Sequence, residues 1–181
     1  ISIIIKDLST VLKTEVKAHY FNCSTSKKQN EFSKYLILEN CDEIKSSIFD
    51  DYSENTGLLD ESSSSEIVKW GSHLLRSNCK ITLQPDWGSV YIKMKSKKLP
   101  TKSGFLKYIV SLRNENHFHE EICEMIFTRL NNIYNPSELT VTCLYTRRGG
   151  IDINPVRSLK RNDLPEHLTN HEVLTNMEFR Q

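Results

Sequence analysis

Hydrophobic residues follow two different periods along this chain, and each period predicts one type of secondary structure. Alternating apolar residues, together with one short apolar run, indicate strands over residues 15–21, 35–38, 79–83, 89–94, 139–145 and 151–157. Apolar residues spaced three or four apart indicate helices over residues 3–12, 65–77, 105–112 and 122–133. Asn135 and Pro136 end the last helix, because the residue before a proline is driven out of helical geometry.

Local signals mark where some of these elements begin and end. An acidic, Ser-rich stretch over residues 50–66 is the best candidate boundary between the front part of the chain and the rest. Ser63 and Glu66 have the spacing of a capping box for the helix expected after them. Residues 85–88 (PDWG) are expected to interrupt the strand pattern.

The order of elements predicts the fold class. From Cys79 onward the expected order is strand, strand, helix, helix, strand, strand. Two helices separated by so few residues are antiparallel neighbours, and the strands need them to cover an apolar face. The sequence therefore predicts an α+β fold with two sequential antiparallel helices on one face of a four-stranded antiparallel sheet.

Length, charge and cysteine content narrow the class of protein. The chain has 181 residues and a formal net charge of +1, which fits one domain or two small ones and leaves no broad basic surface for nucleic acid. No apolar run approaches the ~20 residues of a membrane-spanning helix. Five cysteines without a Cys-x-x-Cys pair argue against a secreted disulfide framework, so a reducing, cytoplasmic setting is expected.

Cys79 and Asp86 are the first candidates for chemistry. Each has an ordinary explanation, because a strand cysteine is commonly a small buried apolar side chain and an aspartate beside a proline commonly caps a turn. Together they suit a thiolate that adds to an electron-poor carbon while the acid protonates the heteroatom that gains charge. Trp87 would favour the protonated acid, because an apolar ring desolvates a neighbouring carboxyl group.

His119 and Glu120 stand at the entry to the second long helix. Acidic residues are ordinary in the first turn of a helix. His117 and His119 are two residues apart, which places them on one face of a strand but not of a helix, so a His-x-His metal site is disfavoured. The functional interpretation is that Glu120 recognises the N–H edge of a guanine-like base, with His119 beside it.

Residues 147–150 (RRGG) allow two interpretations. One is a hairpin turn with exposed charges. The other is a phosphate clamp, because arginine offers a bidentate fork and glycine lets a backbone N–H approach a phosphate. The chain contains no Gly-x-Gly-x-x-Gly dinucleotide motif.

Four strings in the second half of the chain resemble one family, the NADPH-dependent 7-cyano-7-deazaguanine reductases, which are the nitrile reductases of the queuosine pathway. They come in the family's order and spacing and comprise residues 72–79 (SHLLRSNC), 84–89 (QPDWGS), 118–120 (FHE) and 145–155 (YTRRGGIDINP). The closing residues 179–181 (FRQ) also resemble the end of the family's long form. Four motifs in register make the resemblance specific.

The resemblance implies a fold and a reaction. The fold is the tunnelling fold (T-fold), which assembles into barrels across subunits, and the long form is a homo-oligomer, a dimer. The reaction is NADPH-dependent reduction of the nitrile of 7-cyano-7-deazaguanine to 7-aminomethyl-7-deazaguanine, without a metal and without direct contact to nucleic acid or membrane. Cys79 would form a covalent thioimide with the nitrile carbon, Asp86 would protonate the nitrile nitrogen, and His119 would assist proton delivery.

The same resemblance implies the binding residues. Phe118, His119 and Glu120 would bind the substrate base, and the cofactor NADPH would contact residues of the turn, namely Arg147, Arg148 and Gly149.

The sequence departs from the family in two places. Val156 stands where members commonly carry Trp. The long form also carries a second, degenerate copy of the fold upstream, with a Glu-Ser-Lys-Ser-x-Lys-Leu-Tyr signature, whereas residues 43–46 (EIKS) are the nearest string here and lie in another context. We therefore expect residues 1–64 to be the tail end of that upstream copy plus the Ser-rich connection, and residues 65–181 to be the catalytic T-fold domain, the C-terminal portion of a long-form enzyme.

Two other functions remain open at this point. One is a zinc-dependent cyclohydrolase-like enzyme of the same fold, which would need Cys79, His119 and a further ligand. The other is a catalytically silent base-binding module, which the missing upstream signature makes plausible.

Overall fold

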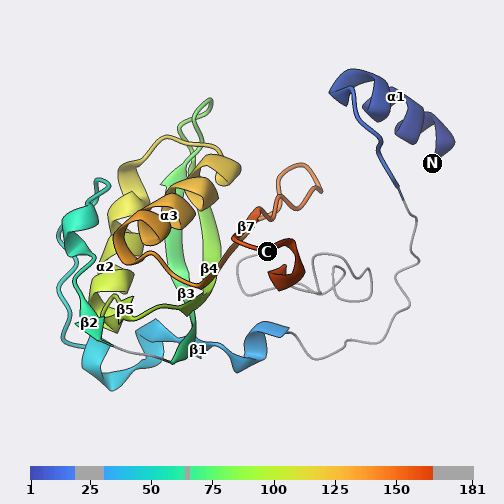
Figure 1. Cartoon of the computed structure of the whole chain (residues 1–181). Coiled ribbons are helices and arrows are strands. Elements are labelled where there is room, and N and C mark those ends of the chain that lie inside the picture. Colours follow the sequence, from blue (N-terminus) through green and yellow to red (C-terminus); the bar gives the residue numbers. More distant parts are fainter. Residues whose placement is uncertain (19–30, 64–65, 165–181) are drawn as a thin grey trace.

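A five-stranded sheet forms the centre of the computed structural model, which describes residues 1–18, 31–63 and 66–164 (Figure 1). The strand order is β1-β3-β4-β6-β7. The strands are β1 (Leu36–Ile37), β3 (Ile67–Asn78), β4 (Pro85–Lys95), β6 (Glu138–Tyr145) and β7 (Val156–Ser158). Neighbours are antiparallel except β1, which pairs in parallel with β3. A separate two-stranded ladder joins β2 (Ser62–Ser63) to β5 (Lys98–Leu99).

Three α-helices accompany the sheets in the described residues: α1 (Ser2–Leu12), α2 (Lys102–Ser111) and α3 (His119–Tyr134). Short 3-10 turns occupy Glu31–Lys34, Leu38–Asn40, Asp42–Ile44, Thr56–Leu58, Leu112–Asn114 and Arg161–Asp163. The predicted α+β class is confirmed, but the predicted four-stranded sheet is wrong, because the sheet has five strands and includes β1 and β3 but no strand over residues 79–83. None of the helices in the described ranges has the length and apolar character needed to cross a bilayer.

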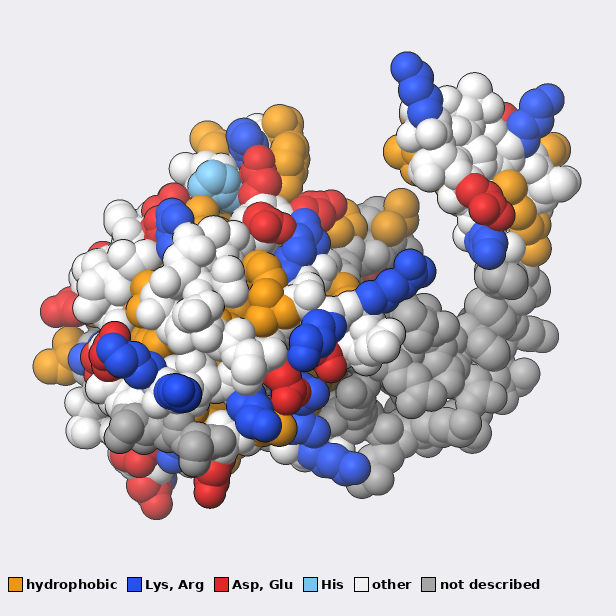
Figure 2. Space-filling model, in the orientation of Figure 1, with side chains coloured by type: hydrophobic (Ala, Val, Ile, Leu, Met, Phe, Trp, Pro, Cys, Tyr) orange, Lys and Arg blue, Asp and Glu red, His pale blue; other side chains and the backbone are white. Residues whose placement is uncertain are grey.

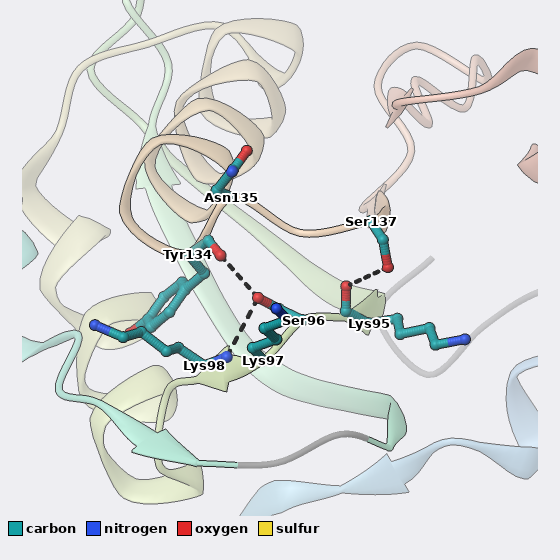
Figure 3. A pocket seen from close by; sticks show the side chains of 7 residues that line it. All are labelled: Lys95, Ser96, Lys97, Lys98, Tyr134, Asn135 and Ser137. Atoms are coloured by element: carbon teal, nitrogen blue, oxygen red, sulfur yellow. Dashed lines mark hydrogen bonds between the residues drawn. The ribbon is translucent and has the colours of Figure 1, made fainter.

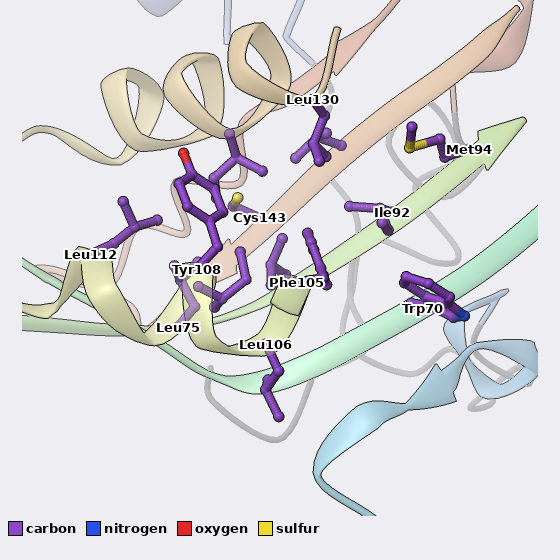
Figure 4. Packing of buried hydrophobic residues seen from close by; sticks show 14 of the residues in the cluster. Trp70, Leu75, Ile92, Met94, Phe105, Leu106, Tyr108, Leu112, Leu130 and Cys143 are labelled. Atoms are coloured by element: carbon purple, nitrogen blue, oxygen red, sulfur yellow. The ribbon is translucent and has the colours of Figure 1, made fainter. Parts of the chain in front are cut away.

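The main core lies between the sheet and the two helices α2 and α3 (Figures 1 and 4). Alternate residues of the strands and one stripe of each helix are buried there, including Phe105, Tyr108, Ile126, Leu130, Leu75, Ile92, Met94 and Cys143. Full burial of a side chain of this size stabilises a fold by about 1.5–3 kcal/mol. These contacts fix the start of α3 relative to β4, which matters for the candidate site.

A smaller apolar cluster covers part of the opposite face of the sheet. Tyr91 and Leu144 point to that side, and Phe32 stacks on Tyr91 with ring centroids 3.9 Å apart. Tyr35 and Ile37 pack against the same cluster. The sheet is therefore covered on both faces around its middle strands.

Residues 31–63 contribute to the same core as the rest of the body. Leu38, Ile44 and Leu59 are buried in the main cluster, and Glu54 forms an ion pair with Arg129 of α3 at 2.7 Å. The division of the chain near residue 64 stays a prediction.

The helix predicted over residues 65–77 is wrong, because this stretch is strand β3. A bulge interrupts its pairing with β4 between Ser72 and Leu75. The apolar residues spaced as in a helix do not share one buried face, because Trp70 is buried, Leu74 is partly buried and Ile67 is 45% exposed. The bulge also breaks the two-residue period that would have indicated a strand.

The strand predicted over residues 79–83 and the break predicted over residues 85–88 are also wrong. Residues 79–84 form the turn between β3 and β4, and β4 already begins at Pro85. Leu83 has a left-handed backbone with φ of 56°, and two backbone hydrogen bonds join Cys79 to Leu83 and Gln84 at 2.8 Å each. Pro85 is tolerated because it is the first residue of its strand.

The remaining predictions differ mainly at their edges. The predicted helices over 3–12, 105–112 and 122–133 and the strands over 89–94 and 139–145 are present. The last strand is restricted to Val156–Ser158. Of the strand expected over 15–21, residues 15–18 have no regular structure, and the others lie outside the described residues.

Candidate functional site

Asp86 lies at the centre of the candidate site. It is the second residue of β4, and the alternation of the strand turns its side chain toward the helix layer, where it is 3% exposed. His119 Nε2 lies 3.2 Å from Asp86 Oδ2, and Arg148 Nε donates to Oδ1 at 2.9 Å. A terminal nitrogen of Arg148 also pairs with Oδ1 and donates to the Pro85 carbonyl at 2.8 Å. We call Asp86, His119 and Arg148 the inner cluster.

His119 is the first residue of α3 and its side chain is 6% exposed. Burial lowers the pKa of its imidazole, and the nearby Asp86 carboxylate opposes this shift. The positive end of the helix dipole also disfavours a protonated imidazole at this position. His119 is therefore a neutral side chain near pH 7, able to donate one proton and accept another.

Cys79 follows Asn78, the last residue of β3. Backbone hydrogen bonds join Asn78 to the segment before α3. The Asn78 N–H donates to the Glu115 carbonyl at 2.8 Å, and the His117 N–H donates to the Asn78 carbonyl at 3.1 Å. Lys80 reaches the same segment through Glu121, with Nζ and Oε1 3.0 Å apart. These contacts place the Cys79 turn beside the helix that carries His119.

The environment of Cys79 favours a thiolate. Its side chain is partly exposed, and hydrogen bonds from the side chain and backbone of Thr82 and from the backbone of Ile81 lower the pKa of the thiol. The Asp86 carboxylate has a smaller effect in the opposite direction. A thiol of lowered pKa with access to solvent has the properties of a reactive cysteine.

Trp87 does not have the role expected from the sequence. Consecutive residues of a strand point to opposite faces, so Trp87 and Asp86 diverge. The Arg76 guanidinium lies over the Trp87 ring at 5.6 Å. The helix layer and Arg148, rather than the neighbouring indole, therefore bury Asp86.

The remaining predicted site residues lie at the surface, and we call them the outer residues: Phe118, Glu120, Arg147 and Gly149. Phe118 is 43% exposed and Lys80 Nζ lies 5.7 Å from its ring centroid. Arg147 pairs with Asp152 at 2.6 Å. Gly149 has φ of 57°, and a side chain added there would meet no atom within 4 Å, so its backbone is open to a ligand.

Glu120 lines a cavity of about 430 Å³ along α3. The other lining residues are His117, Glu121, Glu124, Met125, Thr128, Arg129 and Arg157. Figure 2 shows acidic and basic side chains intermingled over the face of the molecule that carries α3, without a single-sign field. Glu120 therefore lines a groove of mixed charged and apolar groups and is close enough to His119 to influence the pKa of its imidazole.

A larger cavity, of about 570 Å³, lies away from these residues (Figure 3). It is lined by Lys95, Ser96, Lys97, Lys98, Tyr134, Asn135 and Ser137. Lys95 ends β4 and Tyr134 ends α3, whereas Asp86 and His119 stand at the beginnings of the same two elements. This cavity and the inner cluster therefore lie at opposite ends of the sheet and helix.

No three His, Cys, Asp or Glu side chains lie close enough to share a metal ion within residues 1–18, 31–63 and 66–164.

One further contact of the inner cluster could not be read from the sequence. The ring of Tyr145, the last residue of β6, stacks on the His119 imidazole with centroids 3.9 Å apart. Its strand position predicts burial, but only the packing of α3 on β6 brings the two rings together.

Comparison with known proteins supports the sequence resemblance. Residues 85–163, from the start of β4 to beyond β7, match the model of the family described as "QueF-like protein". This region of the chain is therefore similar to the QueF-like proteins.

More specifically, the chain is homologous to proteins named "NADPH-dependent 7-cyano-7-deazaguanine reductase". It is 55% identical to that of Rickettsia canadensis over 97 residues, which are 53% of this chain and 35% of the relative. It is 38% identical to that of Psychrobacter cryohalolentis over 170 residues, which are 86% of this chain and 58% of the relative. The aligned part of the chain spans 35% of the length of the first relative and 58% of the second.

A solved structure of an archaeosine synthase QueF-Like in the apo form is also similar. It has a TM-score of 0.46 and 21% identity, over 54% of this chain and 95% of that chain.

Proposed function

We propose that this chain carries the chemical centre of a 7-cyano-7-deazaguanine reductase, which reduces the nitrile to 7-aminomethyl-7-deazaguanine with NADPH in queuosine biosynthesis. The observation that supports it most directly is the buried pair of Asp86 and His119, 3.2 Å apart, next to the turn that carries the partly exposed Cys79. The names of the relatives supply the substrate and the cofactor. The fold is proposed to be a T-fold, and the subunits to associate as a homodimer.

Cys79 is the nucleophile. Its sulfur attacks the nitrile carbon, one π bond of the C≡N group breaks, and the nitrogen gains the electron pair and takes up a proton. The product is a covalent thioimide, with no atom lost from the substrate. Thr82 and Ile81 assist because their hydrogen bonds raise the fraction of thiolate near neutral pH.

Asp86 and His119 deliver the proton. Their 3.2 Å contact lets a proton pass between Nε2 and the carboxyl group, and burial keeps both side chains away from competing water. Arg148 must be included in this step, because its guanidinium is the charge partner of Asp86 in the free protein. We infer that ligand binding loosens this pairing, so that the pair of Asp86 and His119 takes up the proton that the Cys79 thiol loses and passes it to the nitrile nitrogen.

The turn over residues 147–150 suits a cofactor phosphate. It offers two guanidinium groups and two glycines with positive φ whose surroundings are open. Arg147, Arg148 and Gly149 would hold the cofactor, which supplies hydride when bound. Both arginines already pair with carboxylates, so binding replaces these partners.

Glu120 and Phe118 are the proposed contacts for the base. Glu120 offers a carboxylate to a paired N–H edge, and Phe118 offers an exposed ring for stacking. The Phe118 ring lies 5.7 Å from Nζ of Lys80, the residue after Cys79, so a base stacked on this ring would lie near the turn that carries Cys79. Residues 1–64 are proposed to belong to an upstream copy of the fold, and residues 65–181 to the catalytic domain.

Turnover tests this proposal. The purified chain is mixed with NADPH and 7-cyano-7-deazaguanine, and NADPH consumption is followed together with formation of the amine. We expect consumption of two NADPH per nitrile, because the conversion to an amine takes four electrons. NADPH consumption without the amine, or no reaction in the presence of a Cys79 adduct and saturating NADPH, would contradict it.

A further inference from the structure

We propose that Tyr145 is a positioning residue that holds the His119 imidazole in the orientation from which it meets Asp86. The inference deepens the proposed function and rests on it for its catalytic consequence. Tyr145 does not approach the reacting atoms in this role and acts only through His119.

The geometry of the two rings carries the inference. Their centroids are 3.9 Å apart and their planes differ by 4°, so the flat faces lie in contact. Tyr145 is fully buried, and His119 is nearly so. Rotation about the second side-chain bond of histidine is otherwise broad, and a stacked ring on one face restricts it. With that plane fixed, Nε2 is directed at Asp86 Oδ2, 3.2 Å away.

A glycine makes room for the Tyr145 ring. Gly88 pairs with Tyr145 across the β4–β6 ladder and lies two residues after Asp86, on the same face of the sheet. A Cβ atom at position 88 would lie 3.0 Å from Tyr145 Cδ1 and 3.0 Å from the Leu144 carbonyl oxygen. The absence of a side chain at Gly88 therefore lets the tyrosine ring lie flat beneath His119.

The ring of Tyr145, rather than its hydroxyl group, positions the His119 imidazole. Burial raises the pKa of this hydroxyl well above its usual range, so it is neutral at physiological pH. The Ser77 hydroxyl is the polar group that acts on the Tyr145 hydroxyl, and it makes no hydrogen bond to His119. His119 Nδ1 has no hydrogen-bond partner within the described residues, so no hydrogen bond from them competes with the stack in setting the plane of the imidazole.

Two substitutions separate positioning from general packing. Tyr145→Phe keeps the flat ring, whereas Tyr145→Leu keeps an apolar side chain without it. The readouts are the His119 titration, followed by NMR, and the pH dependence of Cys79 adduct formation with 7-cyano-7-deazaguanine. For Tyr145→Phe we expect an unchanged titration and an adduct rate within about twofold of the parent. For Tyr145→Leu we expect an upward shift of the titration, because water reaches the imidazole, and a rate lower by about tenfold or more.

Tyr91→Leu is the matched control, because Tyr91 is also buried and also stacked on an aromatic ring, on the other face of the sheet. It should reduce stability without moving the His119 titration. If Tyr145→Leu does not fold, Gly88→Ala replaces it, since the added methyl group presses on the tyrosine ring, and a smaller shift in the same direction is expected.

An unchanged His119 titration in both Tyr145→Leu and Gly88→Ala would overturn the inference, as would equal losses in Tyr145→Phe and Tyr145→Leu. If the parent chain forms no adduct, the proposed function fails, but the titration still decides whether Tyr145 positions His119.

Discussion

The inner cluster and the outer residues differ in how completely the protein alone defines them. Asp86 and His119 are nearly inaccessible to water, and strands β4 and β6, helix α3 and Arg148 hold them in place. Phe118, Glu120, Arg147 and Gly149 are exposed, and Arg147 is occupied by a neighbouring carboxylate. The chain therefore builds the groups that would act on the reacting atoms more completely than the groups that would recognise the ligands.

This difference has a physical reason. Groups that transfer protons must be preorganised, because misplacement by about 1 Å can cost ~100-fold in rate. Groups that bind a base or a phosphate gain their order from the ligand itself. Substitutions in the inner cluster should therefore change the chain even without ligands, whereas those of the outer residues should become visible only when ligands are present.

Cys79→Ala should have the largest effect. Removing the nucleophile abolishes covalent adduct and turnover, with a loss of about 1,000-fold or more, while substrate binding remains because Cys79 is not among the proposed recognition residues. Turnover and equilibrium binding are measured on the same preparation. Cys41→Ala is the control, since Cys41 is also only partly buried but lies between the 3-10 turns that follow β1, and its removal should not change adduct formation. Normal turnover of Cys79→Ala would refute the covalent mechanism.

Asp86→Asn should have the second-largest effect on turnover. It removes the proton donor and the charge partner of Arg148, so reduction should slow by about 100-fold or more with little change in substrate affinity. Thermal unfolding should also show a loss of about 1–3 kcal/mol, because a buried polar network loses a charge. Unchanged reduction rates in Asp86→Asn would remove this residue from the proton transfer.

Two adjacent arginines allow the sharpest test of the difference between inner and outer positions. Arg148→Gln leaves the buried Asp86 carboxylate without its cation, so stability should fall by about 1–3 kcal/mol even in the absence of ligands. Arg147→Gln breaks only an exposed pair with Asp152, so Tm should stay within about 2 °C of the parent. Both are measured by thermal unfolding. Equal effects of the two substitutions would contradict the distinction.

The pH dependence of stability gives the smallest predicted effect. Burial places the pKa of His119 in the folded chain below its unfolded value of about 6.5, so the unfolded chain binds more protons in that window. The free energy of unfolding should therefore decrease as pH falls below about 6.5 toward the folded pKa. His119→Gln should flatten this part of the profile, measured by Tm between about pH 5 and 7.5. An identical slope in both proteins would contradict a buried neutral imidazole.

The sequence predicted elements well where local periodicity and packing agree. Helices α2 and α3 and strand β6 have apolar spacing that matches their buried faces. Strand β3 was misassigned because its apolar spacing runs across a bulge. The strand predicted over residues 35–38 is present as the shorter β1, and only its pairing with β3 could not be predicted. Neither a bulge nor a pairing between distant strands leaves a local signal.

The same distinction applies to the candidate site. Cys79, Asp86 and His119 could be selected from residue type and motif. The pairing of Arg148 with Asp86 and the stacking of Tyr145 on His119 could not, because both depend on the register of β4 and β6 and on the seating of α3. The contact predicted between Trp87 and Asp86 was wrong, because neighbouring residues of a strand point to opposite faces of the sheet.

The most direct test of the account is intact-mass spectrometry of the chain after incubation with 7-cyano-7-deazaguanine in the absence of NADPH. The account predicts a mass increase equal to one whole substrate molecule, which peptide mapping assigns to Cys79, because addition to the nitrile releases no leaving group. A chain that stays unmodified at saturating substrate, or one modified at another cysteine, would contradict the account.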